Sequence, residues 1–590
     1  MQTTLPIEII SASAGSGKTY TLSKTLVKAL RNGVRPEAVL ATTFTNKAAA
    51  ELVERVRADL FKDQKWEYAQ RIFDGHLGTV NSVCGRLLKE FAFELGLSPV
   101  QDVLPEEDNF FIFERAIAPV SEKYSQEIDA IASRFEINDW RDILKDIINK
   151  IRTNDIDPAS LSKSYEWSWK TFQDILPATS KSGEDRIDKE LTDAIPATYA
   201  ALKQNQSDTT KATKGVIKKL GNHIRSRTET SSMPWPDWAR FSKLEPGAKS
   251  RDLCERLTNA AKIHTSHPRL HRDIQTLVRL LFECAREAVV AFSEFKEKNG
   301  IVDFVDQEKL ALELLRIPEV QERLKEDLKI VFVDEFQDTS PIQLALFIQF
   351  ARLASKSVWV GDQKQAIYGF RGTDPMLMDA VIDKIISPGP PKILSGSYRS
   401  RPGLIHFTNS VFEAAFEPLG ISPDRVRLEP KLEDGPGQKT PLLVWRLSRK
   451  DSTIEKDKAS DDKETRSLAV AVGNLLEQCD DYKILDKNTK QTRPLKPADI
   501  AILCRRNSKC EKVATFLEEY GIRASIPRSG LMSTPECILG FSALRYPGLS
   551  PKFYVRQNES CESQPRSSFF CRIVPCPDLF KISLIPSAIA

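Results

Sequence analysis

Several patterns that mark particular classes of protein are missing from this 590-residue sequence. Its ten cysteines form no CxxC pair, so we expect no disulfide framework and a reducing cytoplasm as the location. We expect no metal cluster at its six histidines either. No apolar run approaches about 18 residues, so no contact with a membrane is expected. The polar N-terminus lacks the basic and apolar segments of a secretory signal.

A strong charge of one sign is also missing. The 85 Lys and Arg residues nearly balance the 81 Asp and Glu residues, which leaves a formal net charge of +4, so a nucleic-acid partner must be argued from local patches. Apolar residues make up 41% of the chain and charged residues 28%, which is typical of a globular protein. At this length about three or four domains are expected, because one hydrophobic core cannot serve the whole chain.

The first informative stretch is residues 8–22, EIISASAGSGKTYTL. A β-branched run precedes a small-residue loop and helical spacing follows it, which predicts a strand, a phosphate-binding loop and a helix. Lys18 would neutralise the β and γ phosphates of a nucleotide, and Thr19 would hold Mg²⁺. An accidental lysine in a Gly/Ser loop is the alternative, which the flanking strand and helix disfavour. The predicted nucleotide-binding residues are Ala12, Ser13, Ala14, Gly15, Ser16, Gly17, Lys18 and Thr19.

An acidic pair supplies the second half of such a site. The apolar run Ile330 to Val333 predicts a strand that delivers Asp334 and Glu335 at its carboxyl end, where open α/β sheets place their chemistry. Asp334 is the predicted partner of Mg²⁺, and Glu335 the base that polarises the attacking water. Acidic pairs at strand ends are also common on solvated surfaces, so the prediction rests on the pair and the loop together.

Four further stretches carry a family resemblance. They are TTFTNKAAAEL, VDEFQDTSPIQ, VGDQKQAIYGFRG and SYRSRPGL, which resemble motifs Ia, II, III and IV of the UvrD/Rep group of superfamily 1 DNA helicases. Within that group, ASAGSGKTYTL, DQKQAIY and FRGTD are most similar to the RecB (exonuclease V beta subunit) and AddA-type branch. The resemblance covers roughly residues 8–545.

This resemblance implies an α/β fold and a DNA motor. The fold would contain a RecA-like P-loop NTPase domain with a helical insertion and a partial second RecA-like domain. The activity would be ATP-dependent 3′→5′ translocation on single-stranded DNA with duplex unwinding, in recombination and repair. ATP and Mg²⁺ would be the cofactors. The partners would be single-stranded DNA, junctions of single-stranded and duplex DNA, and a second helicase/nuclease subunit.

The resemblance also implies roles for residues of motifs III and IV. Gln365 would sense the γ phosphate, Arg399 would reach the same phosphate from the second motor domain, and Tyr398 would stack on adenine. Tyr368 and Phe370 would stack on DNA bases, although packing at a domain interface is an alternative for these rings.

Other residues are predicted to contact DNA phosphates or bases. Capping of the following helix by Thr45 or Asn46 is a second role that is compatible with DNA contact. A basic stretch with no acid, from Lys211 to Arg227, is a candidate patch for the DNA backbone, or else a solvated face. The remaining predicted DNA-contact residues are Thr43, Phe44, Thr45, Asn46 and Arg371.

Motif spacing predicts the domain boundaries. Residues 1–100 and 290–395 would form the first motor domain, 101–289 the helical insertion and 396–546 part of a second motor domain. In that last segment LLVWRL and ADIAILCRR are predicted strands, and KCEKVATFLEEYGI is a predicted helix. Residues 547–590 lose all periodicity, and the later motifs that the family would place there are not found. We therefore expect an aberrant, disordered tail on a truncated helicase, and an ATP- and DNA-binding fragment without unwinding activity is the alternative function.

Overall fold

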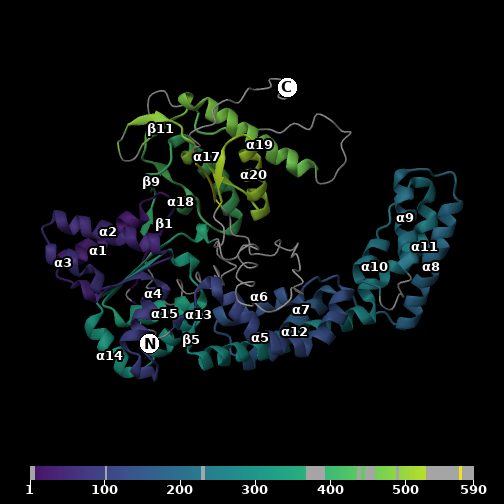
Figure 1. Ribbon diagram of the computed structural model, residues 1–590, viewed down its shortest axis with the longest axis horizontal. Coiled ribbons are helices and arrows are strands. Elements are labelled where there is room, and N and C mark those ends of the chain that lie inside the picture. Colours follow the sequence, from purple (N-terminus) through teal and green to yellow (C-terminus); the bar gives the residue numbers. More distant parts are fainter. Residues whose placement is uncertain are drawn as a thin grey trace, which may run out of the picture. The chain divides into compact units, whose positions relative to one another are not determined.

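Figure 1 shows the protein as a computed structural model. It describes residue 5 and residues 7–99, 102–226, 233–366, 392–434, 440–445, 459–486, 489, 491–526 and 570–574. The chain divides into two compact units. The first unit comprises residues 1–87, 314–339 and 343–590, and the second comprises residues 88–313 and 340–342.

A parallel sheet lies at the centre of the first unit, and its described strands follow the order β3-β2-β6-β7-β1-β8. They are β1 (Ile7–Ala12), β2 (Val39–Thr43), β3 (His76–Thr79), β6 (Ile330–Asp334), β7 (Lys356–Gly361) and β8 (Lys392–Leu394). Apolar runs such as Val331 to Val333 are fully buried, as expected for strands covered on both faces. Because every neighbouring pair is parallel, the residues that follow β1, β2, β6 and β7 gather at one edge of the sheet. The sheet and its helices confirm the predicted α/β class.

Amphipathic helices connect these strands. They are α1 (Lys18–Arg31), α2 (Asn46–Lys62), α3 (Trp66–Arg71), α4 (Val80–Glu90), α14 (Pro318–Asp327) and α15 (Pro341–Leu353). Apolar residues four positions apart lie on one helix face and pack against the sheet. The fully buried ones are Leu22, Leu26 and Leu30 of α1 and Leu52, Val56 and Leu60 of α2.

The rest of the first unit contains short strands and helices. They are β9 (Gly396–Ser397), α17 (Pro402–Phe416), α18 (Pro423–Val426), β10 (Glu429–Pro430), α19 (Ala459–Glu477), β11 (Lys483–Leu485), β12 (Thr492–Pro494), β13 (Ala501–Leu503), α20 (Asn507–Glu519), β14 (Arg523–Ser525) and β15 (Phe570–Val574). β13 and α20 confirm the predicted strand and helix in this segment. The prediction of a strand at LLVWRL is wrong for residues 442–445, which join no strand and leave Val444 79% exposed.

β15 lies in the segment that we expected to be disordered. It pairs antiparallel with β13 and with β14 in a sheet of order β13-β15-β14. The expectation of disorder therefore does not hold for residues 570–574. The physical reason is that aromatic and β-branched residues suit a strand, and the two neighbouring strands supply hydrogen-bond partners on both sides. The other residues of 547–590 lie outside the described residues.

The second unit is helical, apart from the short parallel pair β4 (Asp102–Val103) and β5 (Ile301–Val302). Its helices are α5 (Glu106–Arg134), α6 (Trp140–Thr153), α7 (Leu161–Ile175), α8 (Glu184–Gln204), α9 (Lys211–Ser226), α10 (Trp235–Phe241), α11 (Arg251–Lys262), α12 (Pro268–Asn299) and α13 (Phe304–Leu314). The expected boundary at residue 289 falls inside α12, because this helix continues without a break to a glycine C-cap at Gly300. Within the described ranges, none of the helices combines the length and apolar character needed to cross a membrane.

Two hydrophobic cores lie among the described residues of the second unit. The first lies between α5, α6 and α12 around Trp140 and Phe292. The second holds together α8, α9, α10 and α11, which form the bundle shown in Figure 1 around Trp235 and Trp238. His267, fully buried, caps α12 beside this bundle: its Nδ1 accepts the Arg269 N–H at 3.0 Å. Its other ring nitrogen, Nε2, therefore carries the proton and donates to Asp188 at 3.3 Å.

Acid is expected to destabilise this bundle. Burial alone would raise the pKa of Asp188, but hydrogen bonds from His267 and Arg269 outweigh it and lower the pKa below the ordinary 3.8. A carboxyl group with a lowered folded-state pKa stabilises the fold above its ordinary pKa, and this contribution is lost as the pH falls. Thermal melts followed by circular dichroism should show a midpoint that drops below about pH 4. Asp188→Asn should lower the midpoint at neutral pH and flatten this acid dependence. An unchanged acid dependence in the variant would count against the assignment.

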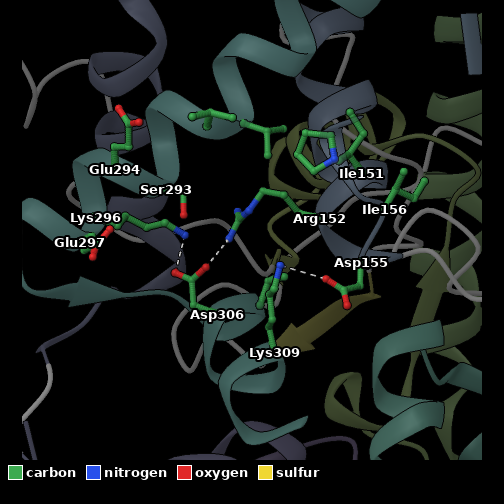
Figure 2. Close-up of a pocket in the computed structure, with 14 residues that line it drawn as sticks. Ile151, Arg152, Asp155, Ile156, Ser293, Glu294, Lys296, Glu297, Asp306 and Lys309 are labelled. Carbon is green, nitrogen blue, oxygen red and sulfur yellow. Dashed lines mark hydrogen bonds and ion pairs between the residues drawn. The ribbon is translucent and has the colours of Figure 1, made fainter. Parts of the chain in front are cut away.

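A buried charge cluster joins three helices at the other end of α12. Lys296 Nζ donates to Asp303 at 3.0 Å and also to Asp306, and Arg152 donates to both oxygens of Asp303 at 2.7 and 2.6 Å. The side chains of Lys296 and Asp303 are only 4% and 3% exposed. Burial and the Arg152 charge lower the pKa of Lys296. Figure 2 shows Arg152, Lys296 and Asp306 converging beside a cavity of about 300 Å³, with Lys309 directed at Asp155.

Candidate functional site

The phosphate loop lies between β1 and α1, as predicted. Gly15 and Gly17 have φ angles of 78° and 90°, a left-handed conformation that glycine adopts without strain. The Ser16 N–H and hydroxyl both donate to the Ser13 carbonyl, at 3.1 and 2.7 Å, which closes the loop on itself. Lys18 begins α1, so the loop ends at a helix N-terminus, where backbone N–H groups favour anions.

Lys18 meets the acidic pair directly. Its Nζ donates to Glu335 Oε2 at 2.5 Å, although 317 positions separate the two residues. Glu335 has a φ of 52°, an uncommon conformation for a residue other than glycine. This contact places a cation of the phosphate loop and a carboxylate at the end of β6 in one site.

Asp334 lies beside this pair at the end of β6. Burial and the Glu335 charge together raise the pKa of Asp334 to about 6, although the Lys18 charge and a hydrogen bond from the Glu335 N–H act in the opposite direction. Burial and the neighbouring negative charge disfavour the ionised form of Asp334, and a bound divalent cation would stabilise that form. The described residues hold no cluster of three or more His, Cys, Asp or Glu side chains arranged for a metal. Mg²⁺ bound with a nucleotide does not need one, because it takes one or two carboxylates and phosphate oxygens. The Asp334 carboxylate therefore fits such an ion, and the role of Thr19 stays a prediction.

Two polar residues that the sequence did not reveal extend the site. Gln337, in the turn after β6, donates to Glu335 at 2.8 Å and accepts the Asp362 N–H at 2.8 Å. Asp362, directly after β7, accepts from Gln365 Nε2 at 2.7 Å. Gln337 and Asp362 are each 2% exposed. The signal that could have found them is their position, since both follow apolar strands of a parallel sheet.

Close backbone approach makes this connection possible. A Cβ atom at Gly361 would lie 2.5 Å from Gln337 Oε1, so only glycine fits between β7 and the Gln337 side chain. The continuous line of contacts runs from Lys18 through Glu335, Gln337 and Asp362 to Gln365. The predicted γ-phosphate sensor is thereby connected to the phosphate loop.

Tyr398 and Arg399 lie against the phosphate loop. The Tyr398 N–H donates to the Gly15 carbonyl at 2.8 Å, and a Cβ atom at Gly15 would lie 2.6 Å from the Cβ of Arg399. Tyr398 is 63% exposed, so its ring is free to stack. Ser397, directly before it, is fully buried, and its Oγ has no hydrogen-bond partner among the described residues. The sequence predicted roles for Tyr398 and Arg399 but gave no reason to single out Ser397.

The predicted DNA-contact residues 43–46 lie at the same edge of the sheet. Thr43 ends β2, and α2 begins at Asn46. Thr45 is the N-cap of α2, and its Oγ1 accepts the Ala48 N–H at 3.1 Å. The capping role is thus confirmed for Thr45, while DNA contact by this segment stays a prediction. Tyr368, Phe370 and Arg371 lie outside the described residues.

These features define a class of protein: a mixed α/β protein with a phosphate loop at the carboxyl edge of a parallel sheet. Residues 4–385 match the UvrD/REP helicase N-terminal domain. Since this match covers more than half of the chain, the chain belongs to the UvrD/REP helicase family. The predicted resemblance to this group is confirmed.

Individual relatives point to one branch of the family. An ATP-dependent helicase/nuclease subunit from Ligilactobacillus salivarius is 23% identical over 574 residues, which are 85% of this chain and 46% of the relative. The protein of the same name from Levilactobacillus brevis is 25% identical over 599 residues, 87% of this chain and 47% of the relative. The exonuclease/helicase subunit RexA of Streptococcus pneumoniae serotype 4 is 23% identical, with 87% and 46% covered. The chain spans about half the length of these curated relatives.

Proposed function

We propose that this chain is an ATP-dependent DNA helicase that moves 3′ to 5′ on single-stranded DNA in recombination and repair. The parallel sheet would belong to a RecA-like motor domain, the second unit would be its helical insertion, and residues 396–546 would form part of a second motor domain. The observation that carries the proposal is the line of contacts from Lys18 to Gln365. It joins the nucleotide site to motif III, which the family resemblance assigns to the DNA site.

The residues have separate tasks in ATP hydrolysis. Lys18 would contact the β and γ phosphates, and Glu335 would accept a proton from the attacking water. Mg²⁺, held by Asp334 and Thr19, would neutralise phosphate charge when bound. Arg399 would stabilise the charge that develops on the transferred phosphoryl group. Tyr398 would stack on the adenine ring beside the loop.

The substrate would be single-stranded DNA and its junctions with duplex DNA. Thr43 to Asn46 would contact it at the carboxyl edge of the sheet, near the end of β2. The names of the relatives describe subunits of a helicase/nuclease, and we propose that this chain also works with a second protein of that kind.

ATP turnover with and without single-stranded DNA tests the proposal. Turnover of the purified chain should rise when oligothymidylate is added, and Lys18→Ala should remove turnover in both conditions. Lys28→Ala is the matched control, because Lys28 is an exposed lysine on the same helix. A turnover rate that changes neither on addition of DNA nor in the Lys18→Ala variant would contradict the proposed helicase activity and favour an ATP- and DNA-binding fragment.

The basic stretch of the second unit allows a second test. α9 buries Thr213, Val216 and Leu220 and exposes lysines along the opposite face. The spacing of Lys214 and Lys218 places both on one stripe of the helix.

Removing these two lysines should weaken DNA binding in a salt-dependent way. Lys214→Ala with Lys218→Ala should lower the slope of log affinity against log salt by about 1.4 for single-stranded DNA, since each phosphate contact contributes about 0.7. Fluorescence anisotropy with labelled oligothymidylate over a salt series measures this slope. Lys163→Ala with Lys170→Ala removes the same charge from exposed positions of α7 and should leave the slope unchanged. Equal slopes for the two double variants would mean that the lysines of α9 form a solvated face and do not contact DNA.

A further inference from the structure

The outer surface of α2, α3 and the turn that follows α3 carries a row of aromatic rings around one arginine. The rings of Trp66 and Phe61 pack with centroids 5.2 Å apart. The Arg57 guanidinium lies 5.7 Å from the centre of the Phe61 ring and 4.9 Å from that of Phe73. We call these four side chains the aromatic row.

The aromatic row is both exposed and firmly anchored. Trp66 and Phe73 are each 58% exposed, a large fraction for side chains of this size. Phe61 packs against the core of the parallel sheet, so the middle of the row is fixed to the folded unit. Rigid aromatic side chains lose little conformational entropy on binding, and Trp and Arg are enriched among residues that dominate protein interfaces.

The charges around the row indicate what could bind there. Arg57 Nε donates to the Ala69 carbonyl at 3.2 Å, and no carboxylate pairs with Arg57 in the part of the chain that the structure describes. Three nearby cations are paired with acids, Arg55 with Glu51, Lys62 with Asp59 and Arg71 with Glu67, and Lys65 donates to the Arg31 carbonyl at 3.2 Å. The Arg57 guanidinium, which lies between two rings, therefore has N–H donors free to bind one carboxylate. Because the three nearby cations named above are neutralised by acids, this surface offers little attraction to a polyanion.

We propose that the aromatic row is a docking site for a partner protein, whose docking segment carries one Asp or Glu side chain between apolar side chains. The carboxylate would bind the Arg57 fork, and the apolar side chains would cover Trp66 and Phe73. Single-stranded nucleic acid fits less well, because it requires repeated cations along its backbone. This docking does not depend on the proposed ATPase activity, since none of the residues belongs to the nucleotide site.

Binding of short labelled peptides to the full chain tests this docking site. The probe is a set of fluorescein-labelled peptides, each with one Asp or Glu between Leu, Phe or Trp residues, and matched peptides with Asn or Gln in place of the acid. Fluorescence polarisation should detect binding of acidic peptides and roughly tenfold weaker binding of the amide peptides. The affinity for the acidic peptides should fall roughly tenfold or more in each of the variants Arg57→Ala, Trp66→Ala and Phe73→Ala.

Two comparisons separate docking from loss of folding. Arg57→Lys keeps the charge but removes the bidentate fork, and should also weaken binding. Trp167→Ala removes another exposed tryptophan, in the second unit, and should not affect the peptides. Thermal midpoints should stay within a few degrees of wild type for all variants, because the substituted side chains are not in the sheet core. The proposal is overturned if no acidic peptide binds, if the variants bind peptides normally, or if they lose oligothymidylate binding instead.

Discussion

Glu335→Gln is expected to lower the rate of ATP hydrolysis by about 10²–10⁴-fold while nucleotide binding is retained. The amide has nearly the shape of the carboxylate but cannot accept a proton from water. Lys18 loses an ion pair at 2.5 Å and remains free to contact phosphate. Phosphate-release kinetics measure the first effect, and the affinity for a fluorescent ATP analogue measures the second.

Glu54→Gln provides the matched control for this prediction. Glu54 is exposed on α2, and the substitution removes the same charge away from the nucleotide site. It should leave both the rate and the affinity unchanged. If the Glu335→Gln protein hydrolyses ATP at the wild-type rate, Glu335 is not the base.

Lys296→Met is expected to destabilise the second unit by about 3–5 kcal/mol. The substitution leaves the buried Asp303 and the partly buried Asp306 with Arg152 as their one remaining cationic partner in the described cluster. A buried carboxylate that has lost a cationic partner lacks enough ion pairs and hydrogen bonds to replace the water it gave up on folding. Hydrogen exchange of the backbone amides in α6 and α12 measures the loss, since it reports on this unit without requiring the whole chain to unfold in one step.

Lys309→Met tests whether burial is the cause. Lys309 lines the same cavity and pairs with Asp155 at 3.1 Å, but its side chain is 53% exposed. Exposed ion pairs contribute about 0–1 kcal/mol, so this variant should change little. Adding Asp306→Leu to Lys296→Met should restore part of the lost stability, because it removes one of the two carboxylates that have lost Lys296 and places an apolar side chain beside the new methionine. Equal losses in the two lysine variants would refute the account.

The local elements of the nucleotide site could be predicted from the sequence. The loop around Gly15 and Gly17 and the acidic pair after Val333 each depend on residues within a few positions of one another. Strand and helix periodicity predicted their surroundings correctly for the same reason. The strand prediction at residues 442–445 was wrong, because apolar composition alone does not provide a neighbouring strand with which to pair.

The boundaries between units were harder to predict. Motif spacing predicted a boundary near residue 290, but α12 continues past it, since helical hydrogen bonding needs no change at a domain border. The position of Ser397 could not be predicted either, because none of its neighbours in the sequence indicates a buried hydroxyl group beside the phosphate loop.

By itself the sequence determined that this chain has a phosphate loop, an acidic pair at a strand end and the motifs of a helicase family, because each is written in consecutive residues. Only the tertiary structure decided which of these groups touch. The strand order places β6 beside β7 and β7 beside β1, and so brings Lys18 to Glu335 and Gln337, which are more than 300 positions away in the sequence. The buried charges around Lys296 arise in the same way, from residues of α6 and α12 and the start of α13, whereas the aromatic row joins two side chains of α2 to two that follow shortly after it. Side chains on different helices meet through packing, which local periodicity does not encode.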